Sequence, residues 1–182
     1  MNEFGLVPVL ETERLLLRGH QTSDFPESAS MWADPKVVAH ISGVPSSYEQ
    51  SWSRLLGYTG HWHHLGFGYW AVISKEDGSF LGEVGFADYH RDTEPSLKGK
   101  PEAGWALNVR SQGKGVATEA VAAMLVWADA NLKQTHTSSM FDPSHVASIN
   151  VAKKVGYKNK VLGRYGDQET LFMERERQTP GS

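Results

Sequence analysis

Apolar residues recur along the chain in two different periods, and the change from one to the other predicts an order of helices and strands. The run at residues 14–18 holds three consecutive leucines and is typical of a buried strand. Two helices are expected next. The first spans about 22–34 and ends at an Asp-Pro pair, and the second begins at Ser46 or Ser47, each followed three residues later by Glu or Gln as in a capping box.

The remaining apolar pattern alternates between strand and helix spacing. Strands are expected at 67–73, 80–89, 102–109, 135–141, 157–164 and 169–175, and helices at 116–132 and 144–155. The order β-α-α-β-β-β-α-β-α-β-β predicts an α+β fold, with a mixed, mostly antiparallel sheet of about seven strands flanked by four helices. No repeat or linker divides the sequence, so we expect one domain over 1–182 with a core at about 10–175. The final Gly181-Ser182 is interpreted as a remnant of expression.

Charge and composition exclude several classes of protein. Lys and Arg total 18 against 21 for Asp and Glu, a formal net charge of -3, which does not suit a general nucleic-acid binder. No uncharged apolar run approaches the roughly 18 residues that span a bilayer. The first residues also lack the basic start and apolar run of a signal peptide, so a cytoplasmic protein without a membrane partner is expected. With no cysteine, the chain has no disulfide, no thiolate metal site and no cysteine nucleophile.

The glycines are unevenly spread, and two of them form the most informative turn in the sequence. Gly113 and Gly115 separate a predicted strand from a predicted helix. Such a turn lets backbone N–H groups point into one concavity, next to the positive end of the helix, and therefore suits a phosphate or pyrophosphate. The Walker A pattern and the complete dinucleotide fingerprint are both missing here. This favours a ligand whose pyrophosphate is held without being cleaved, such as coenzyme A.

The turn also carries a family resemblance. Residues 112–117, QGKGVA, match the Q/R-x-x-G-x-G/A signature of the GNAT N-acetyltransferases, and residues 113–120, GKGVATEA, resemble the branch that includes the ribosomal-protein N-terminal acetyltransferases. Three flanking segments agree with the family in the same order: 10–18, 102–107 and 148–157. The resemblance implies direct acetyl transfer from acetyl-CoA to a primary amine, on a protein N-terminus or a small molecule. It also implies that no metal is required. Exposed strand edges in such a sheet permit dimers, so a monomer or homodimer is expected.

The resemblance assigns cofactor contacts residue by residue. The pantetheine arm is expected at the main chain of Leu107, Asn108 and Val109, and the pyrophosphate at Gln112, Gly113, Lys114, Gly115, Val116, Ala117 and Thr118. His145 stands where the family's last helix usually carries Asn, and it is carried over as a cofactor contact. Lys153 and Lys154 are candidates for the 3′-phosphate of the cofactor, with ordinary solvated lysines as the alternative.

The sequence offers fewer candidates for a catalytic acid or base than for cofactor contacts. Glu102, at the start of the strand before the turn, is the candidate to accept the proton of the amine through water, and a solvated strand-end acid is the alternative. Glu83 on the neighbouring hairpin is the second candidate, facing either a pocket or solvent. Ser148 matches a family position near the sulfur of the cofactor and is the candidate acid, with a plain surface hydroxyl as the alternative. Tyr89 and Tyr157 are held in reserve.

Three features stay open. His61 and His64 lie one helical turn apart, but no carboxylate accompanies them at ligand spacing, so no metal is expected. The tryptophans around the early helices are expected in the core and in an aromatic acceptor pocket, and the loop at 90–101 is either a lid or a solvated loop. The alternative to an enzyme is a catalytically inactive acyl-CoA-binding regulatory module.

Overall fold

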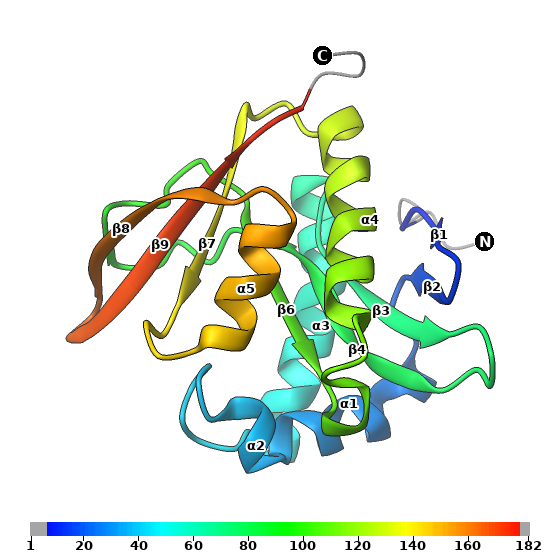
Figure 1. Cartoon of the computed structure of the whole chain (residues 1–182). Coiled ribbons are helices and arrows are strands. Elements are labelled where there is room, and N and C mark those ends of the chain that lie inside the picture. Colours follow the sequence, from blue (N-terminus) through cyan, green and yellow to red (C-terminus); the bar gives the residue numbers. More distant parts are fainter. Residues whose placement is uncertain (1–6, 179–182) are drawn as a thin grey trace.

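The computed structural model describes residues 7–178. It shows a nine-stranded sheet with helices on both faces (Figure 1). The strand order is β1-β2-β3-β4-β6-β7-β9-β8-β5. The strands are β1 (Leu10–Glu11), β2 (Leu15–Arg18), β3 (Tyr69–Ser74), β4 (Phe80–Ala87), β5 (Thr93–Glu94), β6 (Glu102–Leu107), β7 (His136–Phe141), β8 (Lys158–Tyr165) and β9 (Gln168–Glu176). The α-helices are α1 (Phe25–Ala33), α2 (Pro35–Val38), α3 (Tyr48–Leu65), α4 (Val116–Asn131) and α5 (Val146–Lys154).

The predicted fold class and element order are confirmed, and the element count is corrected. Nine strands replace seven because the two-residue strands β1 and β5 pair along β2 and β8. Five α-helices replace four because Asp34, which ends α1, also begins α2: its side chain accepts the amide of Lys36. The strand β6 stops at Leu107 because Val109–Ser111 turns into a 3-10 helix. Gly181 and Ser182 lie outside the described residues.

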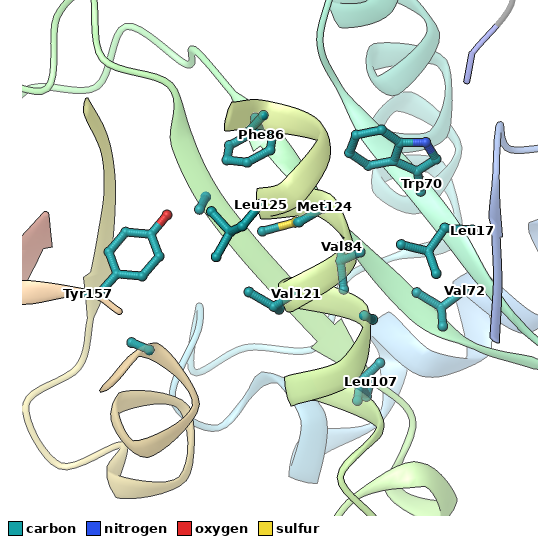
Figure 2. Close-up of a cluster of buried hydrophobic side chains, with 14 of the residues drawn as sticks. Leu17, Trp70, Val72, Val84, Phe86, Leu107, Val121, Met124, Leu125 and Tyr157 are labelled. Carbon is teal, nitrogen blue, oxygen red and sulfur yellow. The ribbon is translucent and has the colours of Figure 1, made fainter. Parts of the chain in front are cut away.

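The main core lies between the sheet and α4. Val84 and Phe86 of β4 point toward Val121 and Met124 of α4, and all four are fully buried (Figure 2). At the edge of this core the ring of Trp62 lies edge-on to Trp70 and Trp127, with centroids 4.7 and 5.4 Å away. The predicted place in the core is therefore confirmed for Trp62, Trp70 and the buried Trp32, whereas Trp52 is 38% exposed. The aromatic acceptor pocket stays a prediction.

The opposite face of the sheet is covered by α1 and α3. Neighbouring residues of a strand point to opposite faces, so Glu83 points toward α1 and α3 while Val84 points toward α4. The second helix begins as the sequence predicts. Ser47 accepts the amide of Gln50, and Gln50 accepts the amide of Ser47, a complete capping box.

Candidate active site

The sheet divides between its two central strands. Within residues 7–178, β6 and β7 share one parallel pair, Glu102 with Ser138. Beyond it β6 stays paired with β4 as far as Leu107, and β7 stays paired with β9 as far as Phe141, so the two strands separate. The half-buried ring of Trp105 lies 5.6 Å from the ring of Phe141. A sheet edge that faces an opening leaves backbone groups free for a ligand.

The glycine turn closes the wide end of this split. Gly113 and Gly115 have φ of +71° and +76°, in the left-handed region that side chains disfavour, so glycine is required by conformation. A Cβ on Gly113 would meet no atom within 4 Å. Among the described residues, no hydrogen-bond acceptor lies at the amides of Gly113, Lys114 or Gly115. The first amides of α4 are free in the same way, as at every helix start.

Some of the other residues expected to contact the cofactor around this turn are exposed, and others are buried or hydrogen-bonded within the protein. Val116 is buried, Ala117 and Thr118 are half-buried, and Gln112 and Lys114 are exposed. The side chain of Asn108 is engaged, because its Nδ2 donates to the carbonyl of Phe80 at 2.8 Å. The carbonyl of Leu107 accepts from Gln112 Nε2 at 3.3 Å. Side chains therefore brace the turn, while its amides remain available to a ligand.

This donor set fits acetyl-CoA on chemical grounds. Clustered amides at a helix start suit a pyrophosphate. The free edge of β6 offers peptide groups to the amides of a pantetheine arm. Lys153 and Lys154 in the last turn of α5 are exposed and remain candidates for a phosphate contact.

The start of α5 lies at the lower end of the molecule in Figure 1, where α4 also begins. Ser148 Oγ is 3.3 Å from His145 Nε2, and the ring of His145 stacks on His40 with centroids 4.7 Å apart. His40 Nδ1 lies 3.3 Å from Asp142 Oδ2. Burial and the neighbouring His40 lower the pKa of His145, so its ring is neutral at pH 7. The structure thus brings His145 and Ser148 together, and it adds His40, whose neighbours in the sequence carry no signal for this site.

Glu102 lies at the opposite, narrow end of the split, without contact to Ser148. It is 8% exposed, and its Oε2 accepts a hydrogen bond from Arg91 Nε at 2.9 Å. The solvated-acid alternative is therefore wrong. Arg91 comes from the loop at 90–101, which is docked: Thr93 and Glu94 pair with β8. Between this loop, the end of β4 and Glu102 lies a cavity of about 170 Å³.

Glu83 faces neither a pocket nor solvent, which corrects both sequence-based expectations. It is fully buried, and its carboxylate accepts hydrogen bonds from Ser28 Oγ at 2.6 Å, Trp32 Nε1 at 2.9 Å and Tyr58 Oη at 2.7 Å. His20 Nε2 lies 3.4 Å away. Burial raises the pKa of Glu83, but the neighbouring imidazole and hydroxyl groups outweigh it and hold the pKa at about 2. A carboxylate so fully engaged is a poor acceptor for a further proton.

The reserve residues and the histidine run have local partners. Tyr157 is buried, and its hydroxyl lies 2.8 Å from that of Thr137. Tyr89 is 41% exposed and packs against the guanidinium of Arg91. His61 Nδ1 contacts the carbonyl of Gly57, one turn back along α3. Over residues 7–178 no group of three or more His, Asp or Glu side chains could hold a metal ion, and no helix is long and apolar enough to cross a membrane.

Comparison with known proteins agrees with this geometry. Residues 14–158 match the family model described as an acetyltransferase (GNAT) domain. The chain is 27% identical to the protein YkkB of Bacillus subtilis, over 92% of this chain and 95% of YkkB. It is 28% identical to an acetyltransferase from Agrobacterium tumefaciens, with a TM-score of 0.81 over 97% of this chain and 98% of that one. The ribosomal L7/L12 α-N-protein acetyltransferase RimL in complex with coenzyme A, at 14% identity, shares the fold, with a TM-score of 0.72 over 93% and 98% of the two chains. The chain belongs to the GNAT acetyltransferase family.

Proposed function

We propose that this protein is an acetyl-CoA-dependent N-acetyltransferase that moves an acetyl group directly to a primary amine. The observation that carries the proposal is the split between β6 and β7, which ends at unpaired amides of a glycine turn at the start of α4. A fold relative with coenzyme A bound supports the choice of cofactor.

Acetyl-CoA, when bound, supplies a thioester. Transfer forms a C–N bond, breaks the C–S bond and moves one proton from nitrogen to sulfur. Residues of this chain bind the cofactor, orient it and move the proton. The turn amides hold the pyrophosphate, and the free edge of β6 orients the arm. Glu102 keeps Oε1 without a partner among the described residues and accepts the proton of the amine. Ser148, hydrogen-bonded to His145, supplies the proton that the sulfur takes. Ser148 then regains a proton from solvent, and Glu102 releases to solvent the proton that it accepted.

A catalytically inactive acyl-CoA-binding module is the second candidate. Two observations favour it: Glu102 is engaged by Arg91, and Glu83 is engaged by three donors. This candidate predicts tight cofactor binding without turnover.

One experiment in two steps separates the candidates. The first step measures the melting temperature with acetyl-CoA, ATP or NAD, and we expect a rise of several degrees with acetyl-CoA alone at about 100-fold excess over its Kd. The second step measures thiol release with a panel of amines. Because the chain has no cysteine, every thiol detected comes from the cofactor. Binding without release supports the inactive module, and no binding overturns both candidates.

A further inference from the structure

The cavity beside Glu102 is lined by side chains of both charges. Two acids, Asp88 and Glu102, line it together with Arg91, Lys98 and Lys100. Its volume of about 170 Å³ is below the roughly 300–1,000 Å³ typical of pockets for drug-sized ligands. The cavity therefore suits a small molecule that carries both kinds of charge.

Arg91 is held rigidly at the wall of this cavity. Its guanidinium carbon lies 4.5 Å from the ring centroid of Tyr89 and 5.1 Å from that of Tyr165. Its Nε donates to Glu102 Oε2 at 2.9 Å, and its Nη1 donates to Tyr165 Oη at 3.2 Å. Among the described residues these contacts leave Arg91 Nη2 and Glu102 Oε1 without partners. A fixed planar guanidinium with free N–H groups is suited to a carboxylate.

The pair also lies where the acyl group is expected. Glu102 belongs to the strand whose other end carries the glycine turn, and Leu107 is five residues further along, about 17 Å at 3.3 Å per residue. An arm extended along the free edge of β6 from the turn reaches toward Glu102.

We propose that this cavity is the acceptor site and that the acceptor is a small amino acid-like molecule, with a primary amine and a carboxylate close together. The inference rests on the proposed function. Glu102 Oε1 receives the ammonium group, and Arg91 Nη2 receives the carboxylate, with Lys98 adding positive charge at the rim. The ammonium group of Lys100 is already paired with Glu174. After Glu102 takes one proton, the amine nitrogen forms the C–N bond, the C–S bond breaks, and the sulfur takes a proton. A polyamine has no carboxylate, so it would leave Arg91 Nη2 and the ammonium group of Lys98 without an anionic partner.

The test compares each common amino acid with the amine that lacks its carboxylate, such as leucine with 3-methylbutylamine, and adds spermidine and a peptide with a free N-terminus. We expect kcat/KM for the preferred amino acid to exceed that of its matched amine by about tenfold or more, the effect of one charge-assisted pair. Arg91→Gln also removes the hydrogen bond to Glu102, which affects both substrates, so the ratio of their kcat/KM values is the readout. We expect the preference for the amino acid over its matched amine to fall by a similar factor, while the Kd of CoA stays unchanged. Arg91→Lys recovers part of the loss, and Lys133→Gln, an exposed lysine outside the cavity lining, has no effect.

Calorimetry of the amino acid with the CoA-bound protein gives a readout that does not depend on turnover. Binding that weakens in Arg91→Gln supports the proposal. Equal rates for each matched pair, or a preference for spermidine or the peptide, would overturn the acceptor assignment and leave acetyl transfer standing. If CoA does not bind, or no amine is acetylated, the proposed function fails instead. The matched pairs in the unaltered protein test the assignment even if Arg91→Gln fails to fold.

Discussion

Arg14 and Glu119, 105 positions apart, hold the glycine turn from outside: Arg14 Nη2 lies 2.6 Å from Glu119 Oε2. The other oxygen of Glu119 accepts the hydroxyl of Thr12 at 2.6 Å and the amide of Arg14 at 3.0 Å. Arg14 Nη1 donates to the carbonyl of Lys114 at 3.0 Å. Thus the segment before β2 contacts both the turn and the first turn of α4.

Glu119→Gln should weaken CoA binding by loosening the turn. Arg14 is about half exposed, so solvent screens the pair, and we expect the Kd to rise only about two- to fivefold. Isothermal titration with CoA measures the change. Arg164→Gln, which breaks the exposed pair with Glu94, is the control and should leave the Kd unaltered. A Kd that does not change in Glu119→Gln would show that the turn keeps its shape without this contact.

Gly115→Val should abolish CoA binding. At φ +76° a β-branched residue is strained by roughly 1–2 kcal/mol, and relief of that strain reorients the amides around it. Gly78→Val is the control with a matched backbone, because Gly78 has φ +72° and lies in the turn between β3 and β4. A Cβ on Gly78 would meet no atom within 4 Å, and one on Gly115 would lie 3.5 Å from Arg14 Nη2, at ordinary van der Waals distance. Both variants should lose similar stability in urea, but only Gly115→Val should lose the cofactor. Normal affinity in a folded Gly115→Val protein would refute the pyrophosphate assignment.

Glu83→Gln should destabilise the fold by about 2 kcal/mol, because the carboxylate accepts charge-assisted hydrogen bonds in a buried site. The pKa of Glu83 is about 2 in the folded protein, below its ordinary value of 4.5. Its stabilising contribution is therefore complete above about pH 4.5 and is lost as the pH falls toward 2. Urea unfolding across this pH range should show the two proteins converging at low pH. Glu76→Gln changes an exposed residue, so its free energy of unfolding should equal that of the unaltered protein at every pH in this range.

Ser148→Ala should lower kcat by about 100-fold or more, the usual contribution of a positioned acid, with little change in the Kd of CoA. Ser53→Ala is the control, because this exposed serine lies on α3 and its side chain makes no hydrogen bond within residues 7–178. Steady-state kinetics and calorimetry together separate the two effects. A parallel loss of CoA affinity would make Ser148 a binding residue.

His145→Ala should raise the Kd of CoA about fivefold, as expected for one hydrogen bond of about 1 kcal/mol. His145→Asn restores the side chain that the family usually carries here, and it should bind CoA at least as tightly as the unaltered protein. Calorimetry of the three proteins measures the series. Equal affinity in His145→Ala would remove His145 from the cofactor contacts.

The glycine turn was predictable from the sequence because its determinants are local. A strand pattern, two glycines and a helix start lie within about 20 consecutive residues, and the backbone adopts the predicted arrangement. The surroundings of the two glutamates were not predictable. Arg91 lies in a polar loop whose sequence gives no sign that it docks on β8, and Glu83 is engaged by residues 25 to 63 positions away. Such contacts are set by how helices and loops pack, which alternation along one strand does not encode.

The single pair between Glu102 and Ser138 means that side chains, more than the backbone ladder, hold the two halves of the sheet together. The strands β7, β9, β8 and β5 form one half of the sheet, and its backbone ladder meets the other half at that point alone within the described residues. The two halves are joined mainly through side chains: Phe141, Leu171 and Met173 belong to the same buried cluster as Val84, Phe86 and Met124. Next to the pair, Ser139 Oγ donates to the carbonyl of Ala103 at 2.8 Å.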